Sequence, residues 1–197
     1  MTELWWSIAA LLGGYLLGAV PFGLLVARAF GLGDVRAIGS GNIGATNVLR
    51  TGSKAAAALT LGLDAGKGAA AVVIAQALGG EIAAMAAGFG AFLGHCYSVY
   101  LGFRGGKGVA TYLGTVLALA FPLGALACAT WLVVALVSRM SSLSALVAAV
   151  TAPVWALVFG HGVLAVPLAA MAAIILLRHR PNIARLLDGT EPRIGRQ

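Results

Sequence analysis

Residues 108–138 read GVATYLGTVLALAFPLGALACATWLVVALVS, an uncharged run of 31 residues whose division decides how the chain crosses a membrane. As one continuous helix this run would be about 46 Å long, whereas the hydrocarbon layer of a bilayer is ~30 Å thick. The run is therefore long for one span and short for two. A turn near Phe121-Pro122 would divide it into two spans, and the charges in the rest of the chain decide whether such a turn exists.

The composition of the whole chain is that of a membrane protein. Of its 197 residues, 60% are hydrophobic and 10% are charged, and the mean hydropathy is +0.97. A soluble domain has roughly 25% charged residues. Glycine pairs such as Gly14/Gly18, Gly62/Gly66 and Gly90/Gly94 have the spacing that allows close contact between helices in lipid. Further apolar runs lie at 4–27, 55–80, 82–103, 143–160 and 162–177. No second domain or long linker interrupts them, which predicts a single domain over residues 1–197.

The basic residues lie almost entirely in alternate connections. With a turn at 121–122, twelve of the thirteen Lys and Arg side chains follow the first, third, fifth and seventh spans. The opposite face carries only Glu3, Glu81 and uncharged turns. The positive-inside rule then predicts seven transmembrane helices with the N-terminus outside and the C-terminus in the cytosol. The net charge of +7 is thereby explained by topology, and no nucleic-acid partner is expected.

The first basic loop reads GSGNIGATNVLR at 39–50. It formally satisfies the GxGxxG fingerprint, but no strand precedes it, so it is not a dinucleotide site. Its chemistry still suits phosphate, because glycine N–H groups can approach an anion, hydroxyl and amide groups donate, and arginine offers a bidentate fork. The same pattern is also typical of a capped glycine-rich turn. The expected phosphate-binding residues are Ser40, Gly41, Asn42, Thr46, Asn47 and Arg50.

A second basic loop, FRGGKGVAT at 103–111, repeats these ingredients immediately before an apolar run. It lacks the GxxxxGK[ST] spacing and the preceding strand of a Walker A loop. We therefore predict an anion site without nucleotide hydrolysis. The residues expected to contribute are Arg104, Gly105, Gly106, Lys107 and Gly108.

Asp64 and Lys67 are charged residues within an apolar run. Their i, i+3 spacing places them on one helix face, where they can neutralise each other. Two interpretations stay open: an ion pair that aligns helices, and direct contact of Lys67 with a substrate phosphate. His95, in the cytosolic half of the third span, is a further candidate. No metal-ligand spacing is present, and no cofactor is expected.

The C-terminal segment RHRPNIARLLDGTE at 178–191 follows the last span as a basic interfacial stretch. Arginines alone would be topological anchors. His179 and Asn182 add polar groups at the expected water boundary, a combination more typical of a site.

Together with DxxKG at Asp64–Gly68 and GHCYSVYLGFRGGKGVAT at 94–111, these segments resemble the bacterial acyl-phosphate:glycerol-3-phosphate acyltransferases of the membrane. The resemblance covers residues 39–191 in order and spacing. It implies a compact seven-helix protein of the bacterial inner membrane with its active site at the cytosolic face. It also implies transfer of a fatty acyl group from acyl phosphate to glycerol 3-phosphate, giving lysophosphatidic acid and phosphate, the first acylation of phospholipid synthesis. A soluble partner enzyme would supply the donor, and the product would pass into membrane lipid.

The resemblance assigns roles as well. It places Ser40, Thr46, Arg50, Lys107, His179 and Asn182 at active-site positions of the family, with the turn from Arg139 to Ser142 as a further correspondence. We expect Arg50 and Lys107 to offset phosphate charge. Ser40 is expected to bind phosphate rather than to act as a nucleophile, because no triad partner lies near it in sequence. Either His179 or a substrate phosphate is expected to accept the hydroxyl proton.

Two other classes fit part of the pattern. A membrane transporter of a phosphorylated metabolite would also use intramembrane charges and anion-binding loops. The polar groups cluster on one predicted face, however, so no continuous path is indicated. A non-catalytic scaffold protein would not need two loops suited to phosphate binding, which argues against that class. The HxxxxD signature of acyl-CoA-dependent glycerolipid acyltransferases is absent from the sequence.

Overall fold

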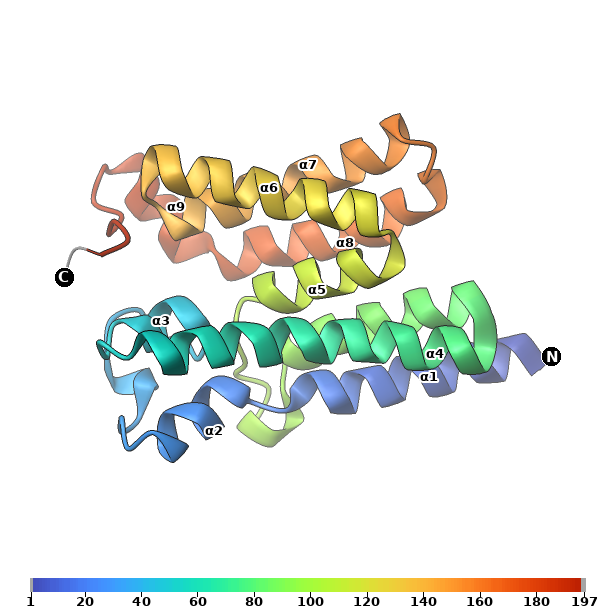
Figure 1. Cartoon of the computed structure of the whole chain (residues 1–197), viewed down its shortest axis with the longest axis horizontal. Coiled ribbons are helices and arrows are strands. Elements are labelled where there is room, and N and C mark those ends of the chain that lie inside the picture. The colour runs from blue at the N-terminus through green and yellow to red at the C-terminus, as the bar shows by residue number, and fades with distance from the viewer. Residues whose placement is uncertain (1, 196–197) are drawn as a thin grey trace. The chain divides into compact units, whose positions relative to one another are not determined.

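The computed structural model describes residues 2–195, and every regular element among them is a helix (Figure 1). The chain divides into two compact units, Met1–Leu119 and Ala120–Gln197, which are described in turn. The all-helical prediction is confirmed. The prediction of a single domain stays a prediction.

The first unit begins with α1 (Thr2–Ala19) and α2 (Phe22–Ala29), which are separated by a break at Val20-Pro21. Proline has no backbone N–H and disfavours helical geometry in the residue before it, so the first helix stops at Ala19. Side chains from elsewhere donate to the carbonyls at this break. The Ser98 hydroxyl donates to Ala19 O over 2.6 Å, and Lys67 Nζ donates to Val20 O over 2.9 Å.

The segment α4 (Lys54–Cys96) consists of two helical arms that run side by side in opposite directions (Figure 1). Gly80 joins them at φ 77° and ψ −166°, a backbone conformation that other residues rarely adopt. The arms touch at Gly88, where a Cβ would lie 2.9 Å from Val72 Cγ2. At ~1.5 Å per residue, the first arm (54–79) is about 39 Å long and the second (81–96) about 24 Å. The first arm therefore exceeds the second by about 15 Å.

Glycines bring α1 into close contact with the second arm of α4. A Cβ on Gly14 or Gly18 would overlap the backbone of Ala87 or Ala91, and a Cβ on Gly90 would overlap the backbone of Leu11. Close backbone approach of this kind gives helix association in lipid its van der Waals contacts. The close packing predicted from the glycine spacings is thus confirmed for Gly14/Gly18 and Gly90/Gly94. For Gly62/Gly66 it is wrong, because a Cβ on either residue would meet no described atom within 4 Å.

The second arm ends earlier than the sequence predicts, at Cys96 rather than near residue 103, because Tyr97 leaves helical geometry. A short 3-10 helix η2 (Val99–Leu101) and a loop lead to α5 (Val109–Leu119). With 11 residues, α5 is about 16 Å long, roughly half the hydrocarbon thickness.

The second unit contains α6 (Phe121–Ser138), α7 (Ser141–Val158), α8 (Gly162–Arg178) and α9 (Arg180–Leu187). Pro122 lies in the first turn of α6, where its missing N–H has no cost. The break between α5 and α6 falls at Ala120, so the turn predicted near Phe121-Pro122 is confirmed. The axes of α8 and α9 differ by 66°.

Several helical segments in the described residues are long and apolar enough to cross a bilayer. Length and composition qualify four of them, or five if α8 and α9 count as one bent span. One of the four, Lys54–Leu101, contains both arms of α4. The segments are Glu3–Ala29, Lys54–Leu101, Phe121–Ser138 and Ser141–Val158. The count of seven spans and the orientation of the termini stay predictions.

Candidate active site

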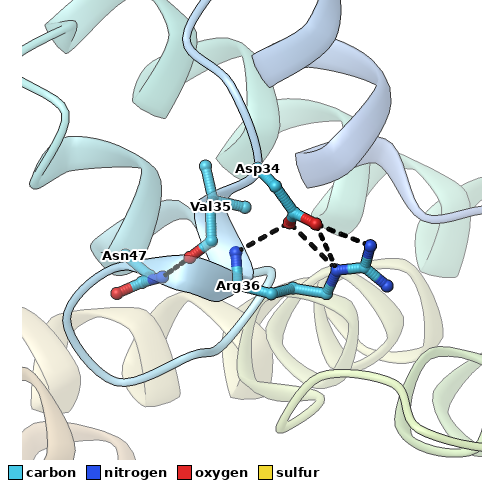
Figure 2. Close-up of polar contacts among 4 residues, drawn as sticks. All are labelled: Asp34, Val35, Arg36 and Asn47. Carbon is cyan, nitrogen blue, oxygen red and sulfur yellow. Dashed lines mark hydrogen bonds and ion pairs between the residues drawn. The ribbon is translucent and has the colours of Figure 1, made fainter.

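Asn47 organises the first basic loop, which contains η1 (Val35–Ala37) and α3 (Ala45–Leu49). Its side-chain NH2 group donates to Val35 O over 2.6 Å and to Asn42 O over 2.7 Å (Figure 2 shows the first of these). Its Oδ1 accepts the Ser40 backbone N–H over 3.1 Å. Asn47 is only 2% exposed. The Asn47 amide N–H groups thus donate to the loop's own carbonyls, and the assignment of Asn47 to phosphate binding stays a prediction.

The guanidinium of Arg50 lies against this framework. Its Nη1 donates to Asn47 Oδ1 over 3.2 Å, and its side chain rests on the backbone of Gly39. A Cβ on Gly39 would lie 2.6 Å from Arg50 Cδ, and φ at Gly39 is 53°. Both facts require glycine at position 39, a residue that was left out of the predicted set. Its only signal in the sequence is that it opens the motif.

The remaining predicted residues of the first loop divide into two kinds. Ser40 and Thr46 are exposed, and the Ser40 hydroxyl donates to Asn47 Oδ1 over 3.3 Å. Gly41 has φ 67° and shapes the turn. Asn42 folds back on the loop, since its Oδ1 accepts the Gly44 N–H over 3.0 Å. Ser40 and Thr46 thus remain phosphate-binding candidates, whereas Gly41 and Asn42 shape the loop.

An exposed ion pair neutralises a second arginine of this loop. Arg36 Nη2 lies 2.7 Å from Asp34 Oδ2, and the Arg36 backbone N–H donates to Asp34 Oδ1 over 2.9 Å (Figure 2). The side-chain hydrogen bond from Arg36, followed by the backbone one, lowers the pKa of Asp34 to about 2. The charge of Arg36 is therefore balanced by Asp34 within the same loop.

The glycines of the second basic loop lie directly on the end of the second arm of α4. A Cβ on Gly105 would overlap His95 O, and a Cβ on Gly106 would overlap the imidazole ring of His95. Gly108, at φ 83°, would place its Cβ 2.8 Å from Cys96 Sγ. The Gly106 N–H donates to His95 O over 2.9 Å. The Gly106 N–H is thus taken up by the end of the helix, and the assignment of Gly106 to phosphate binding stays a prediction.

The cations of this loop differ in exposure. Arg104 is exposed, whereas Lys107 is half-buried beside the glycines that fix its backbone. Lys107 is thus held more firmly than a surface lysine.

A buried cluster of charged residues lies beneath the second loop. Lys67 Nζ is 2.8 Å from Asp64 Oδ1, and His95 Nδ1 is 3.5 Å from the same oxygen. The Lys67 and Asp64 side chains are 1% and 3% exposed. Lys67 also lies over the Phe22 ring, 5.6 Å from its centroid. Its charge is satisfied inside the protein, which favours the helix-aligning ion pair over direct contact of Lys67 with phosphate.

In the second unit, Glu191 connects the predicted residues Ser142 and Asn182. Its Oε1 accepts the Ser142 hydroxyl over 2.7 Å and the Asn182 side-chain N–H over 2.6 Å. Its Oε2 accepts Arg185 Nε over 2.8 Å. Glu191 was not predicted as a site residue. Its signal is that it is one of only six acidic residues in the chain and closes the third motif.

Arg139 and His179 flank this Glu191 cluster. Arg139 ends α6 in a left-handed conformation, and its carbonyl accepts the N–H of Ile194, which holds the C-terminal segment against the turn. His179 lies between α8 and α9, and its Nδ1 is 2.8 Å from Ile175 O. A neutral imidazole that donates from Nδ1 has its lone pair on Nε2. The contact with Ile175 O fits the tautomer that carries its proton on Nδ1.

Acid should weaken the Glu191 cluster. Burial opposes ionisation of Glu191, but hydrogen bonds from Ser142, Asn182 and Arg185 outweigh burial and hold its pKa below the ordinary 4.5. Ionised Glu191 thus stabilises the fold above pH 4.5, and this contribution is lost as the pH falls through the lowered pKa. We expect Glu191→Gln to cost about 1–3 kcal/mol of unfolding free energy at pH 7 and progressively less below pH 4.5. Thermal unfolding in detergent measures this.

The exposed acid Asp188 provides the control for that experiment. Asp188→Asn should leave the unfolding midpoint nearly unchanged at either pH, since exposed substitutions are usually within about 0.5 kcal/mol. A Glu191→Gln protein as stable as wild type at pH 7 would contradict the role of the carboxylate.

Apolar helices together with basic, glycine-containing loops define a class: integral membrane proteins that handle small phosphorylated molecules. The sequence model described as glycerol-3-phosphate acyltransferase matches residues 8–189. The chain belongs to the glycerol-3-phosphate acyltransferase family.

Relatives and solved structures agree with this assignment. The glycerol-3-phosphate acyltransferase of Jannaschia sp. (strain CCS1) is 64% identical over 190 residues, 96% of this chain and 93% of that protein. The one from Ruegeria sp. (strain TM1040) is 66% identical over 184 residues, 93% and 91% of the two chains. Crystal structures of PlsY (YgiH), an integral membrane glycerol 3-phosphate acyltransferase, are also similar. Its glycerol 3-phosphate form has a TM-score of 0.89 at 38% identity, covering 99% of this chain and 96% of that one. Its lysophosphatidic acid form has a TM-score of 0.85 at 36% identity, with the same coverage.

This membership confirms the family and the acyltransferase activity predicted from the three motifs. It decides against the transporter and the scaffold. The protein is an integral membrane acyltransferase that acts on glycerol 3-phosphate.

Proposed function

We propose that this protein transfers a fatty acyl group from acyl phosphate to the 1-hydroxyl of glycerol 3-phosphate and releases lysophosphatidic acid and inorganic phosphate. The observation that carries the proposal is the likeness, over 99% of the chain, to PlsY in its glycerol 3-phosphate and lysophosphatidic acid forms, a substrate and a product of such a reaction. The donor is proposed to come from a soluble enzyme.

The chemistry requires two phosphates to be held near each other against their mutual repulsion. Arg50, fixed on Gly39 and Asn47, and Lys107, fixed by the packed loop glycines, are proposed to supply the fixed positive charges. Ser40 and Thr46 would add hydroxyl donors from the loop surface. Fixed cations of this kind need no reorganisation as charge develops on the leaving phosphate.

In the reaction, the glycerol oxygen forms a bond to the acyl carbon, and the bond from that carbon to the phosphate oxygen breaks. The leaving phosphate keeps the electron pair. The hydroxyl proton passes either to His179 or to a substrate phosphate, the two acceptors expected from the sequence. Ser142 and Asn182, held by Glu191, are proposed to orient substrate. No acyl-enzyme is needed, because phosphate is already a good leaving group.

The direct test is turnover by purified protein in detergent. With palmitoyl phosphate and glycerol 3-phosphate, we expect equal amounts of lysophosphatidic acid, measured by mass spectrometry, and of inorganic phosphate. Palmitoyl-CoA and palmitoyl-acyl carrier protein are the matched donors and should give no product. Turnover with either of these and none with acyl phosphate would overturn the proposed donor.

We further propose seven spans, an outside N-terminus and an active site at the cytosolic face of the bacterial inner membrane. The alternation of basic and non-basic connections supports this orientation. A membrane-impermeant thiol reagent should label Lys54→Cys only from the cytosolic side and Glu81→Cys only from the opposite side. Labelling of both from one side would contradict the topology.

A further inference from the structure

The backbone of Gly106 lies against the Nε2 edge of the buried His95 ring: a Cβ built on Gly106 would overlap His95 Nε2. The three atoms nearest to a Cβ built on Gly106 all belong to the His95 ring. The Gly106 N–H also donates to the His95 carbonyl over 2.9 Å. The residue that follows is Lys107. The ring and carbonyl of His95 together therefore support the backbone of the segment that carries Lys107.

His95 is itself held in place by contacts within the first unit. His95, at the end of the second arm of α4, lies 3.5 Å from Asp64 on the first arm, and Asp64 pairs with Lys67 over 2.8 Å. Lys67 then donates to Val20 O at the break between α1 and α2. His95 is 4% exposed, so the ring has little freedom to move. Polar contacts thus link the α1 break to His95 through Lys67 and Asp64, and the longest of them is the 3.5 Å contact between Asp64 and His95.

We propose that His95 is a positioning residue for Lys107, anchored through the ion pair of Asp64 and Lys67. In this arrangement the three buried residues do not touch substrate. They fix the backbone at Gly106 and so hold the Lys107 ammonium where phosphate charge develops. Misplacement of a catalytic group by about 1 Å is enough to cost much of its effect on the rate. The inference rests on the proposed role of Lys107 in binding phosphate.

The contact between Gly106 and the His95 ring can be tested by adding a methyl group at Gly106 and then removing the ring that it meets. Gly106 has no left-handed φ, so alanine is compatible with its backbone, and the added methyl meets the His95 ring. We expect Gly106→Ala to lower kcat/KM at least a hundredfold and His95→Ala to lower it about tenfold. The double variant should recover to the level of His95→Ala, because removal of the ring makes room for the methyl group.

Gly105 is the matched control. Its added methyl would meet backbone atoms of His95 and Cys96, which His95→Ala does not remove. His95→Ala should therefore not rescue Gly105→Ala. Equal rescue of both glycine variants, or no rescue of Gly106→Ala, would show that the His95 ring does not position the Gly106 backbone.

Two further measurements separate positioning from general stability and from the proposed function. His95→Ala should change the same kinetic parameter as Lys107→Ala, KM or kcat, with an unfolding midpoint close to wild type. A loss of folded protein that accounts for the lost activity would overturn the positioning role. Wild-type activity of Lys107→Ala would contradict the proposed function of Lys107, whereas an inactive Lys107→Ala with a fully active His95→Ala would overturn only the present inference.

Discussion

Lys107→Ala is expected to lower kcat/KM for glycerol 3-phosphate acylation at least about a hundredfold while the protein remains folded. Lys107 is half-buried, and its backbone lies between the closely packed Gly106 and Gly108, so its side chain starts from a fixed position. Loss of one preorganised group that stabilises a developing anion typically costs 10²–10³ in rate. Steady-state kinetics with acyl phosphate and glycerol 3-phosphate measure the effect. Lys107→Arg, which keeps the charge but changes its shape, should retain more activity than Lys107→Ala.

Lys54→Ala is the control for general charge effects. Lys54 is an exposed cation at the start of α4, outside the predicted site, and its removal should change kcat/KM by less than about twofold. If Lys107→Ala and Lys54→Ala were equally active, the charge of Lys107 would serve topology alone.

Asp64→Ala is expected to lower the free energy of unfolding by about 3–5 kcal/mol, because it leaves the Lys67 ammonium buried without its counter-ion. The Asp64→Ala/Lys67→Met double variant should recover part of this loss, since no unpaired charge then remains. The midpoint of thermal unfolding in detergent measures both effects.

Glu81→Ala is the matched control for the acidic substitution. Glu81 is exposed beside the reversal of α4, so its removal should cost less than about 0.5 kcal/mol. An Asp64→Ala protein as stable as Glu81→Ala would show that the buried pair contributes nothing to the fold.

The helical architecture could be predicted from the sequence because a bilayer imposes strict demands on length and hydropathy. The break at Ala120 and the close glycine contacts of α1 followed from this logic. The early end of α4 at Cys96 did not, because hydropathy does not register that Tyr97 leaves helical geometry and that the Ser98 hydroxyl donates to Ala19 O. Hydropathy measures the preference of a segment for lipid, whereas hydrogen bonds decide where its helix stops.

For the candidate site, the types of residue could be predicted from the sequence, but the partners toward which their donors point could not. Asn47 and Gly106 carry donors that suit phosphate, yet the structure aims these donors at carbonyls of the protein. Glu191 was missed because an acidic residue in a phosphate-binding protein looks unfavourable until its three donors are seen. Sequence spacing lists possible partners, and only the fold selects among them.

The reversal at Gly80 also bears on how the chain enters a bilayer during synthesis. Asp64 and Lys67 would each oppose insertion of the first arm alone by roughly 2.5–3.5 kcal/mol if they lay at the centre of a spanning helix. The second arm carries no charged residue between Ile82 and Leu93 and is joined to the first by a single residue. The two arms are therefore suited to enter as one helical hairpin, in which the apolar second arm offsets the charges of the first.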